Sequence, residues 1–177
     1  MMKLWSKRHR DLARQRNRVA CRLHAVLCDL VTGGVPDEIY AGKATVLLAA
    51  VDVDGAVAAA RVELAGELLE DLRRLDTQIA ESKKRLAGVV AASGTTTTTI
   101  FGVGPVVAAM VVGITGDVAR FATRNRFAAF NGTAPIEVSS GGRKTYRLSR
   151  RGNRQVNHAI HMAAVTQIRF RHSCRRP

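Results

Sequence analysis

Residues 56–92 read AVAAARVELAGELLEDLRRLDTQIAESKKRLAGVVAA, and this stretch decides the fold because its apolar residues recur at helical spacing. One stripe carries the large apolar side chains, with Ser82 in one expected apolar position: Leu68, Leu72, Leu75, Ile79 and Leu86. No proline interrupts the stretch. The pattern therefore predicts a long amphipathic helix from about Ala56 to Ala92.

A second long helix is predicted on the N-terminal side, from about Leu4 to Val31. Its apolar residues recur at coiled-coil-like spacings: Leu12, Val19, Leu23, Val26 and Leu30. Two such helices joined by a compact middle predict an antiparallel helical hairpin. An intermolecular coiled coil fits the same pattern, so a homodimer or tetramer is also expected.

The segment between the two long helices is predicted to be short and structured. Turn residues 33–36 end the first helix, and Asp37 is expected to cap a short helix that ends near Val51. Asp52 and Asp54 then belong to a turn. We interpret these two aspartates as turn residues rather than as metal ligands.

The cysteines point to a reducing compartment. Cys21, Cys28 and Cys174 form neither a disulfide framework nor a CxxC pair. Cys21 and Cys28 are expected to share a helix face as small buried thiols. The cysteine usage therefore predicts a reducing cytoplasm. No apolar stretch reaches the length of a membrane-spanning helix, so no membrane contact is expected.

The charge is concentrated in the second half of the chain. Residues 1–93 hold 15 Lys and Arg against 12 Asp and Glu, whereas residues 94–177 hold 13 against two, Asp117 and Glu137. A net charge of +11 over this half favours a polyanionic partner, and nucleic acid more than a membrane surface. The threonine run 95–99 follows Ser93 and Gly94 and is a poor helix former. Two domains are therefore predicted, a helical linker region of residues 1–93 and a DNA-binding domain of residues 94–177.

The basic half opens with a motif suited to phosphate. In the sequence GVGP, Gly102 and Gly104 precede Pro105, which is typical of a turn that feeds a helix with proline at its first position. The glycines allow a phosphate to approach the backbone, and the free N–H groups of the new helix point toward it. The motif predicts a helix-hairpin-helix contact with DNA, although a turn before a buried helix explains it equally well. Further on, Thr123 is expected to cap a short helix that ends at Gly132.

Residues 135–153, PIEVSSGGRKTYRLSRRGN, place two serines before a glycine pair and then only basic charges. They predict a loop or hairpin over residues 136–142 and a short strand from Arg143 to Leu148. A final helix is expected from about Asn153 to Arg169, with an apolar side that holds Val156, Ile160, Ala163, Ala164 and Ile168. This stretch is either a flexible basic loop or a scaffold that delivers a serine nucleophile to a phosphodiester. On the final helix, His158 and His161 have the spacing of a metal pair but no third ligand near in sequence, which favours packing, capping or phosphate contact.

Five motifs in this half occur in the order of a known family: Gly-x-Gly, Gly-Asp with Arg-Phe, Gly-x-Ala-Pro, Ser-Gly, and Arg-Gly-Asn opening a helix. The run resembles the C-terminal domain of the insertion-sequence transposases of the IS one-ten family. The preceding helices resemble the coiled-coil linker of the same proteins. The resemblance implies a DNA recombinase in which a serine of this domain becomes covalently joined to DNA. It also implies that some members use an element-encoded RNA that bridges donor and target.

Carried onto this sequence, the resemblance implies that Ser140 is the nucleophile, with Ser139 as the alternative. The neighbouring cations become phosphate or transition-state contacts by position and charge: Arg143, Lys144, Arg147, Arg150, Arg151 and Arg154. Family members hold Mg²⁺ on the carboxylates of an N-terminal RNase-H-like domain, for which we find no counterpart here. We therefore expect no metal in this chain, a truncated transposase, and no strand transfer by the chain alone.

Two hypotheses from other functional classes remain. The chain could be a non-catalytic helix-hairpin-helix module that binds DNA or RNA, or a coiled-coil interaction protein whose basic half is incidental. Phosphate binding weakens steeply as the salt concentration rises. A salt-dependent affinity for nucleic acid therefore distinguishes the two hypotheses that involve nucleic acid from the coiled-coil interaction protein. The fold is predicted to be mainly α, with a helical hairpin followed by a compact helical domain that carries a small β-hairpin.

Overall fold

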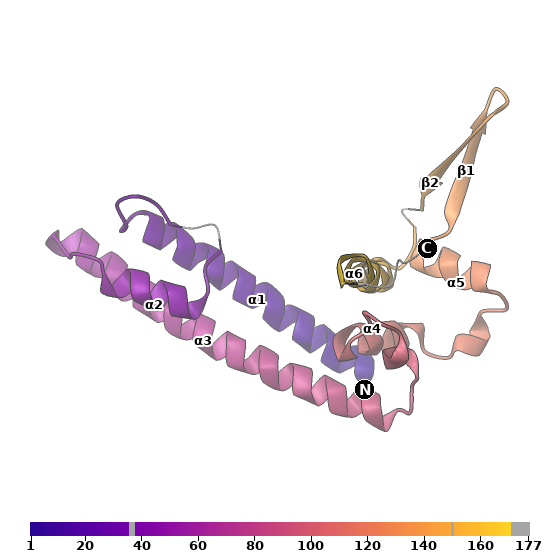
Figure 1. The fold of residues 1–177 in the computed structure, drawn as a ribbon, viewed down its shortest axis with the longest axis horizontal. Coiled ribbons are helices and arrows are strands. Elements are labelled where there is room, and N and C mark those ends of the chain that lie inside the picture. Colours follow the sequence, from indigo (N-terminus) through magenta and orange to yellow (C-terminus); the bar gives the residue numbers. More distant parts are fainter. Residues whose placement is uncertain (36–37, 150, 171–177) are drawn as a thin grey trace. The chain divides into compact units, whose positions relative to one another are not determined.

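The computed structural model describes residues 1–35, 38–149 and 151–170. It is mainly helical with one two-stranded sheet, as the sequence predicts (Figure 1). The elements follow in this order: α1 (Met2–Cys28), α2 (Ala41–Ala49), α3 (Gly55–Ala92), the 3₁₀ turn η1 (Thr97–Thr99), α4 (Pro105–Thr115), the 3₁₀ turn η2 (Val118–Arg120), α5 (Arg124–Asn131), β1 (Pro135–Ser140), β2 (Arg143–Leu148) and α6 (Arg154–Phe170). They form two compact units, one of residues 7–84 and one of residues 1–6 with residues 85 onward.

Within the 7–84 unit, α1 and α3 lie antiparallel. Arg16 Nε donates to Asp76 Oδ1 at 2.8 Å, and Arg61 Nη2 lies 3.5 Å from Asp29 Oδ2. The residue number rises along α1 between these two pairs while it falls along α3, so the helices run in opposite directions. The predicted intramolecular helical hairpin is confirmed.

Small and branched apolar side chains fill the core of this unit, including one from α2: Ala20, Leu23, Leu27, Ile39, Ala44, Ala65, Leu69 and Leu72. Burying each leucine contributes about 1.5–3 kcal/mol before the entropy of folding is subtracted. The predicted stripes are correct for Leu12, Leu23, Leu72 and Leu75, which are all buried. On α1, Leu27 is fully buried, whereas the expected Val26 is only partly buried.

The start of α2 and the environment of the cysteines were both predicted from the sequence. The N-cap of α2 is Tyr40, which makes no side-chain capping bond, and Asp37 lies outside the described residues.

The predicted burial of the cysteines is wrong, because Cys21 and Cys28 are both exposed. They do share a helix face, but Leu23 and Leu27 occupy the side that faces the core, which leaves the thiols on the opposite side.

The other unit is built on α4 and α6, which pack against each other through small side chains. Ala108 and Ala109 of α4 are fully buried in a cluster with Leu86 and Val90. On α6, the buried residues are Val156, Ala159 and Ala163. Ala159 thus replaces the expected Ala164 in the core. Ile168, also expected on the apolar side, is 70% exposed.

The ends of the helices in this unit follow the sequence signals. Gly104 is the N-cap of α4 and Pro105 its first residue. Thr123 Oγ1 accepts from Arg126 N at 3.3 Å at the start of α5, and Gly132 closes that helix with φ +77°. Asn153 Oδ1 accepts from the backbone N–H of the second and third residues of α6, both at 3.1 Å.

Candidate nucleic-acid interface

The β-hairpin exposes every residue of β1 and residues 143–147 of β2. β1 and β2 pair antiparallel in a register that runs from Pro135 opposite Leu148 to Ser140 opposite Arg143. Gly141 and Gly142 connect the strands with φ of +57° and +79°. Two successive positive φ angles suit a tight two-residue turn that side chains other than Asn, Asp and Gly disfavour. The predicted hairpin and strand are confirmed.

The register assigns the two candidate serines to opposite faces, because side chains alternate along a strand. Ser140 lies directly across from Arg143, and the same face carries Thr145 and Arg147. Ser139 lies across from Lys144 on the other face. The two serines are neighbours in sequence and therefore have different chemical surroundings.

Charge is distributed unequally between these faces. On the Ser139 face, Lys144 Nζ lies 3.8 Å from Glu137 Oε1, an exposed ion pair that water screens. The Ser140 face has Arg143 and Arg147 with no carboxylate among the strand residues that share it. The Ser140 face is therefore the more strongly electropositive one.

The base of the β-hairpin is closed by contact between two motifs far apart in sequence. A Cβ at Gly152 would overlap the backbone of Gly132 and would lie 2.7 Å from the carbonyl carbon of Asn131. Asn153 N donates to Phe130 O at 2.7 Å beside this contact. The Gly-x-Ala-Pro and Arg-Gly-Asn motifs thus meet where the two strands leave the helices.

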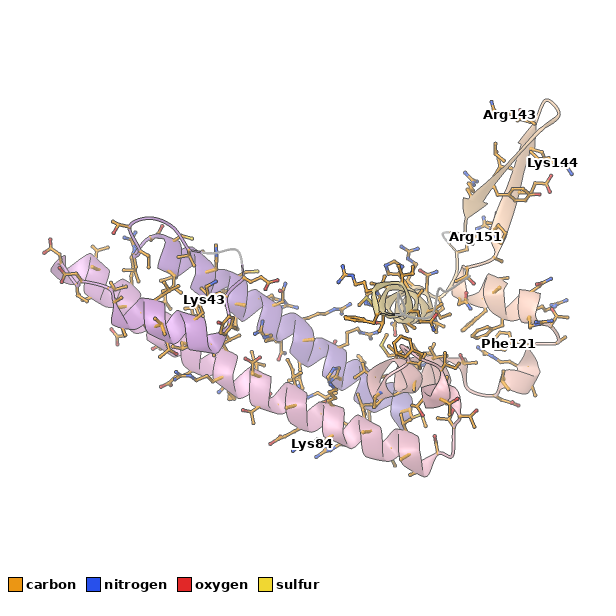
Figure 2. The ribbon with its side chains drawn as sticks, viewed as in Figure 1. Lys43, Lys84, Phe121, Arg143, Lys144 and Arg151 are labelled. Atoms are coloured by element: carbon orange, nitrogen blue, oxygen red, sulfur yellow. The ribbon has the colours of Figure 1, made fainter. Side chains whose placement is uncertain are left out.

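The other predicted cations lie near this base. Arg151 is exposed, and its N–H donates to Ser149 Oγ at 3.2 Å. Arg154 is exposed at the first position of α6. Figure 2 shows Arg143 and Lys144 toward the turn of the β-hairpin and Arg151 at its base. Arg150, the remaining predicted contact, lies outside the described residues.

Gly102 and Gly104 are not brought to the β-hairpin. A Cβ at Gly102, whose φ is +84°, would lie 2.8 Å from the carbonyl oxygen of Ala163 on α6. Gln167 Nε2 also donates to Phe101 O at 2.6 Å. Close packing on the C-terminal half of α6 therefore explains why residue 102 is a glycine. A Cβ at Gly104, in contrast, would meet open space. A DNA contact through these glycines stays a prediction.

An arginine–phenylalanine cluster lies beside the base of the β-hairpin. Its three rings, those of Phe121, Phe127 and Phe130, are partly buried, and their centroids lie 5.2–6.4 Å apart. The exposed Arg120 holds its guanidinium carbon 4.5 Å from the Phe121 centroid and 4.8 Å from that of Phe130. Arg120 and Phe121 form the Arg-Phe motif of the family resemblance. No contact role was predicted for Arg120, because a single arginine next to a phenylalanine carries no periodic signal.

Groups suited to proton transfer or metal binding are sparse at this interface. Among residues 1–35, 38–149 and 151–170, no three His, Cys, Asp or Glu side chains gather closely enough to hold a metal ion. His158 and His161 are exposed on α6. Among the described residues, His9 of α1, far from this interface in sequence, has a pKa that is lowered by burial and, to a smaller extent, by Lys83.

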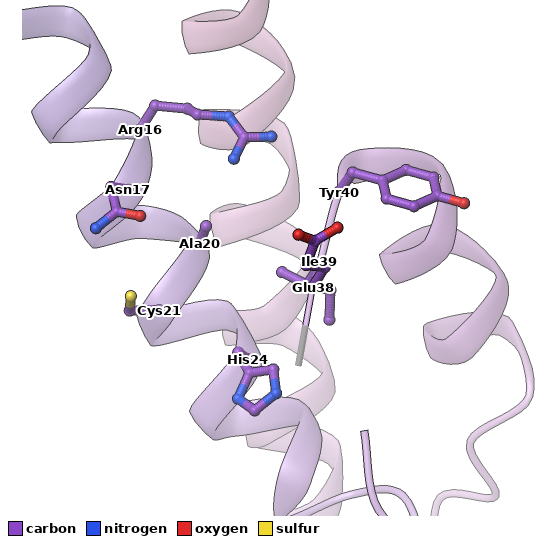
Figure 3. Close-up of a pocket in the computed structure, with 8 residues that line it drawn as sticks. All are labelled: Arg16, Asn17, Ala20, Cys21, His24, Glu38, Ile39 and Tyr40. Carbon is purple, nitrogen blue, oxygen red and sulfur yellow. The ribbon is translucent and has the colours of Figure 1, made fainter. Parts of the chain in front are cut away.

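A cavity of about 460 Å³ in the 7–84 unit has a different character (Figure 3). It lies between α1 and residues 38–40, and its lining includes Arg16, Glu38 and His24. The two charged side chains have opposite signs, and Arg16 already donates to Asp76. This cavity therefore does not have the electrostatic character of a polyanion site.

The comparison with known proteins bears on the C-terminal half. Residues 95–177, just under half of the chain, match the model of a family described as Transposase IS116/IS110/IS902 family. The match supports a C-terminal region of an insertion-sequence transposase of this kind, as the resemblance implied. No curated protein matches the chain. None of the helices in the described part of the chain combines the length and apolar character needed to span a bilayer.

Proposed function

We propose that this chain takes part in DNA transposition, with the β-hairpin contacting DNA and Ser140 acting as the nucleophile when a base that the Ser140 face does not supply removes its proton. The single observation that carries the proposal is the family match over residues 95–177, the segment that contains the hairpin. The geometry supports it, because Ser140 lies across from Arg143 on the face that carries two arginines and no carboxylate. Arginine binds phosphate oxygens in a bidentate manner, which suits this site.

The proposed step is a transesterification. The Ser140 Oγ–phosphorus bond forms, and the bond between phosphorus and a deoxyribose oxygen breaks. The serine loses a proton, and the departing deoxyribose oxygen gains one to become a hydroxyl. One phosphodiester bond replaces another, so the bond energy is retained in the protein–DNA linkage. Arg143 and Arg147 would offset the charge that develops on the phosphate oxygens in the transition state.

The serine must also lose its proton, and this face does not supply the group that removes it. The described strand residues beside Ser140 include no His, Asp or Glu. Mg²⁺ prefers carboxylate oxygens, and Glu137 lies on the other face with Lys144, so these residues do not fit a magnesium site beside the serine. A metal used in the reaction would need other ligands.

This observation favours a second candidate function, a nucleic-acid-binding module without catalysis. The same basic surface suits RNA phosphates, so a guide RNA stays a prediction from the resemblance. Association into dimers or tetramers is likewise a proposal, which light scattering of the full chain would test. Both candidate functions require binding that weakens with salt.

The nucleophile is tested by incubating the full chain with DNA of the element ends and Mg²⁺, followed by denaturing electrophoresis. We expect no covalent protein–DNA adduct, because the described Ser140 face lacks a base. An adduct that Ser140→Ala abolishes and Ser139→Ala retains would establish catalysis and contradict a binding-only role. An adduct abolished only by Ser139→Ala would contradict the assignment of Ser140.

A further inference from the structure

The outward side of α6 carries basic residues beyond those of the β-hairpin, and only Arg154 among them was already predicted as a phosphate contact. Val156, Ala159 and Ala163 define the buried side of this helix. Each residue turns the helix by about 100°, so the opposite side holds four exposed basic or imidazole side chains, with Val165 and the exposed Ile168 between them: Arg154, His158, His161 and Arg169. We call these four residues the outer face of α6.

The length of this face suits a nucleic-acid strand. Arg154 and Arg169 are fifteen residues apart on one helix, which corresponds to about 22 Å at a rise of 1.5 Å per residue. One strand of duplex DNA carries a phosphate about every 3.4 Å along its axis. The four side chains could thus follow one strand over about six phosphates.

No carboxylate from the surrounding helices neutralises this face. α6 packs on α4 and touches α5. α4 has no titratable side chain, α5 has only Arg124 and Arg126, and α6 has no Asp or Glu. The turn that meets the C-terminal half of α6 does so through Phe101 and Gly102, and Arg151 precedes its start.

The two acids of residues 94–177 are occupied elsewhere. Asp117 Oδ1 accepts from Ala119 N at 2.9 Å, and Glu137 lies beside Lys144. A proton gained by an imidazole on the outer face therefore adds a positive charge that no acid of these three helices cancels. Imidazole side chains change charge between about pH 5 and 8.

We propose that the outer face of α6 is a second phosphate-contacting surface, whose affinity for nucleic acid rises when His158 and His161 are protonated. This inference rests on the proposed binding of nucleic acid. It assigns to the two histidines a role that is independent of Ser140 and of metal ions. Arg154 and Arg169 supply the permanent charge of the surface, and the histidines supply the part that depends on pH.

The test is fluorescence anisotropy of the full chain with a short duplex that carries a pH-insensitive dye, at about pH 5.5 and about pH 8, across a salt series. Two added phosphate contacts should steepen the slope of log K against log salt by about 1.8 at the lower pH. The double variant His158→Gln/His161→Gln should lose this steepening. The double variant His158→Arg/His161→Arg should show the steeper slope at both pH values.

His24→Gln, in the helical hairpin, is the matched control and should keep the pH response. A double glutamine variant that retains the full response would overturn the inference, as would a wild-type slope that does not change with pH. Either of these two results leaves the proposed function intact, provided that binding at the higher pH persists and depends on Arg143 and Arg147. Absence of binding at both pH values would overturn the inference and the proposed function together.

Discussion

Adjacent residues can differ in function when they belong to a strand. Ser139 and Ser140 have the same chemistry, but the register gives Ser140 two arginines on its face and gives Ser139 a lysine already paired with Glu137. The family resemblance favours Ser140, and the geometry supports the same choice on independent grounds. The proposal of Ser140 as the nucleophile thus rests on strand alternation as well as on the local Ser-Gly motif.

Gly152 illustrates a residue whose importance comes from contact rather than from chemistry. Gly152→Ala should destabilise the α4–α6 unit by about 1–3 kcal/mol, because its Cβ would overlap the backbone of Gly132. Gly88→Ala in α3 is the matched control, since its Cβ meets open space and alanine favours a helix by about 0.5–1 kcal/mol. Urea unfolding of both variants checks this. Equal shifts in the same direction would contradict the close contact.

The sequence predicted local features of this region but not that contact. Gly132 was expected to close a helix and Asn153 to open one, because caps and glycines act within one turn of the chain. The meeting of Gly132 with Gly152 depends on how the β-hairpin returns to α6, twenty residues later. The exposure of Cys21 and Cys28 was missed for a related reason, since periodicity identifies a shared face but not which face a partner covers.

At the scale of elements, the α1–α3 pair shows how far an apolar stripe predicts packing. Ser82 occupies an expected apolar position and is indeed buried at 8% exposure. Its Oγ has no hydrogen-bond partner among the described residues. A buried hydroxyl without a partner costs free energy, because it leaves water and gains nothing in return.

Ser82→Ala should therefore stabilise the helical hairpin by about 1 kcal/mol, in contrast to most substitutions. Ser6→Ala is the matched control, because Ser6 is also buried on a helix but its Oγ donates to Lys3 O at 3.1 Å. The control should give no such gain. Thermal unfolding followed by circular dichroism measures both variants, and a loss of stability in Ser82→Ala would contradict this account of the stripe.

At the scale of the whole chain, charge and fold divide the molecule in a similar way. The 7–84 unit has a core of leucines and alanines with ion pairs between its helices. The described basic residues of the C-terminal half lie on η2 and α5, on the exposed β-hairpin and its base, and on the surface of α6. Composition alone predicted the nucleic-acid partner, whereas the faces that carry the charge required the register and the helix packing.

The central claim is that DNA binds to the Ser140 face of the β-hairpin rather than to positive charge in general. The most direct test measures the association constant K for DNA over a salt series and plots log K against log salt for two double variants. Arg143→Ala/Arg147→Ala removes the two arginines of the Ser140 face. The control, Lys83→Ala/Lys84→Ala, removes two exposed charges from α3. The hairpin variant should bind DNA more weakly and lower the slope by about 1.8, whereas the α3 variant should change it little. Equal effects of the two variants, or no effect of the hairpin variant, would contradict the claim.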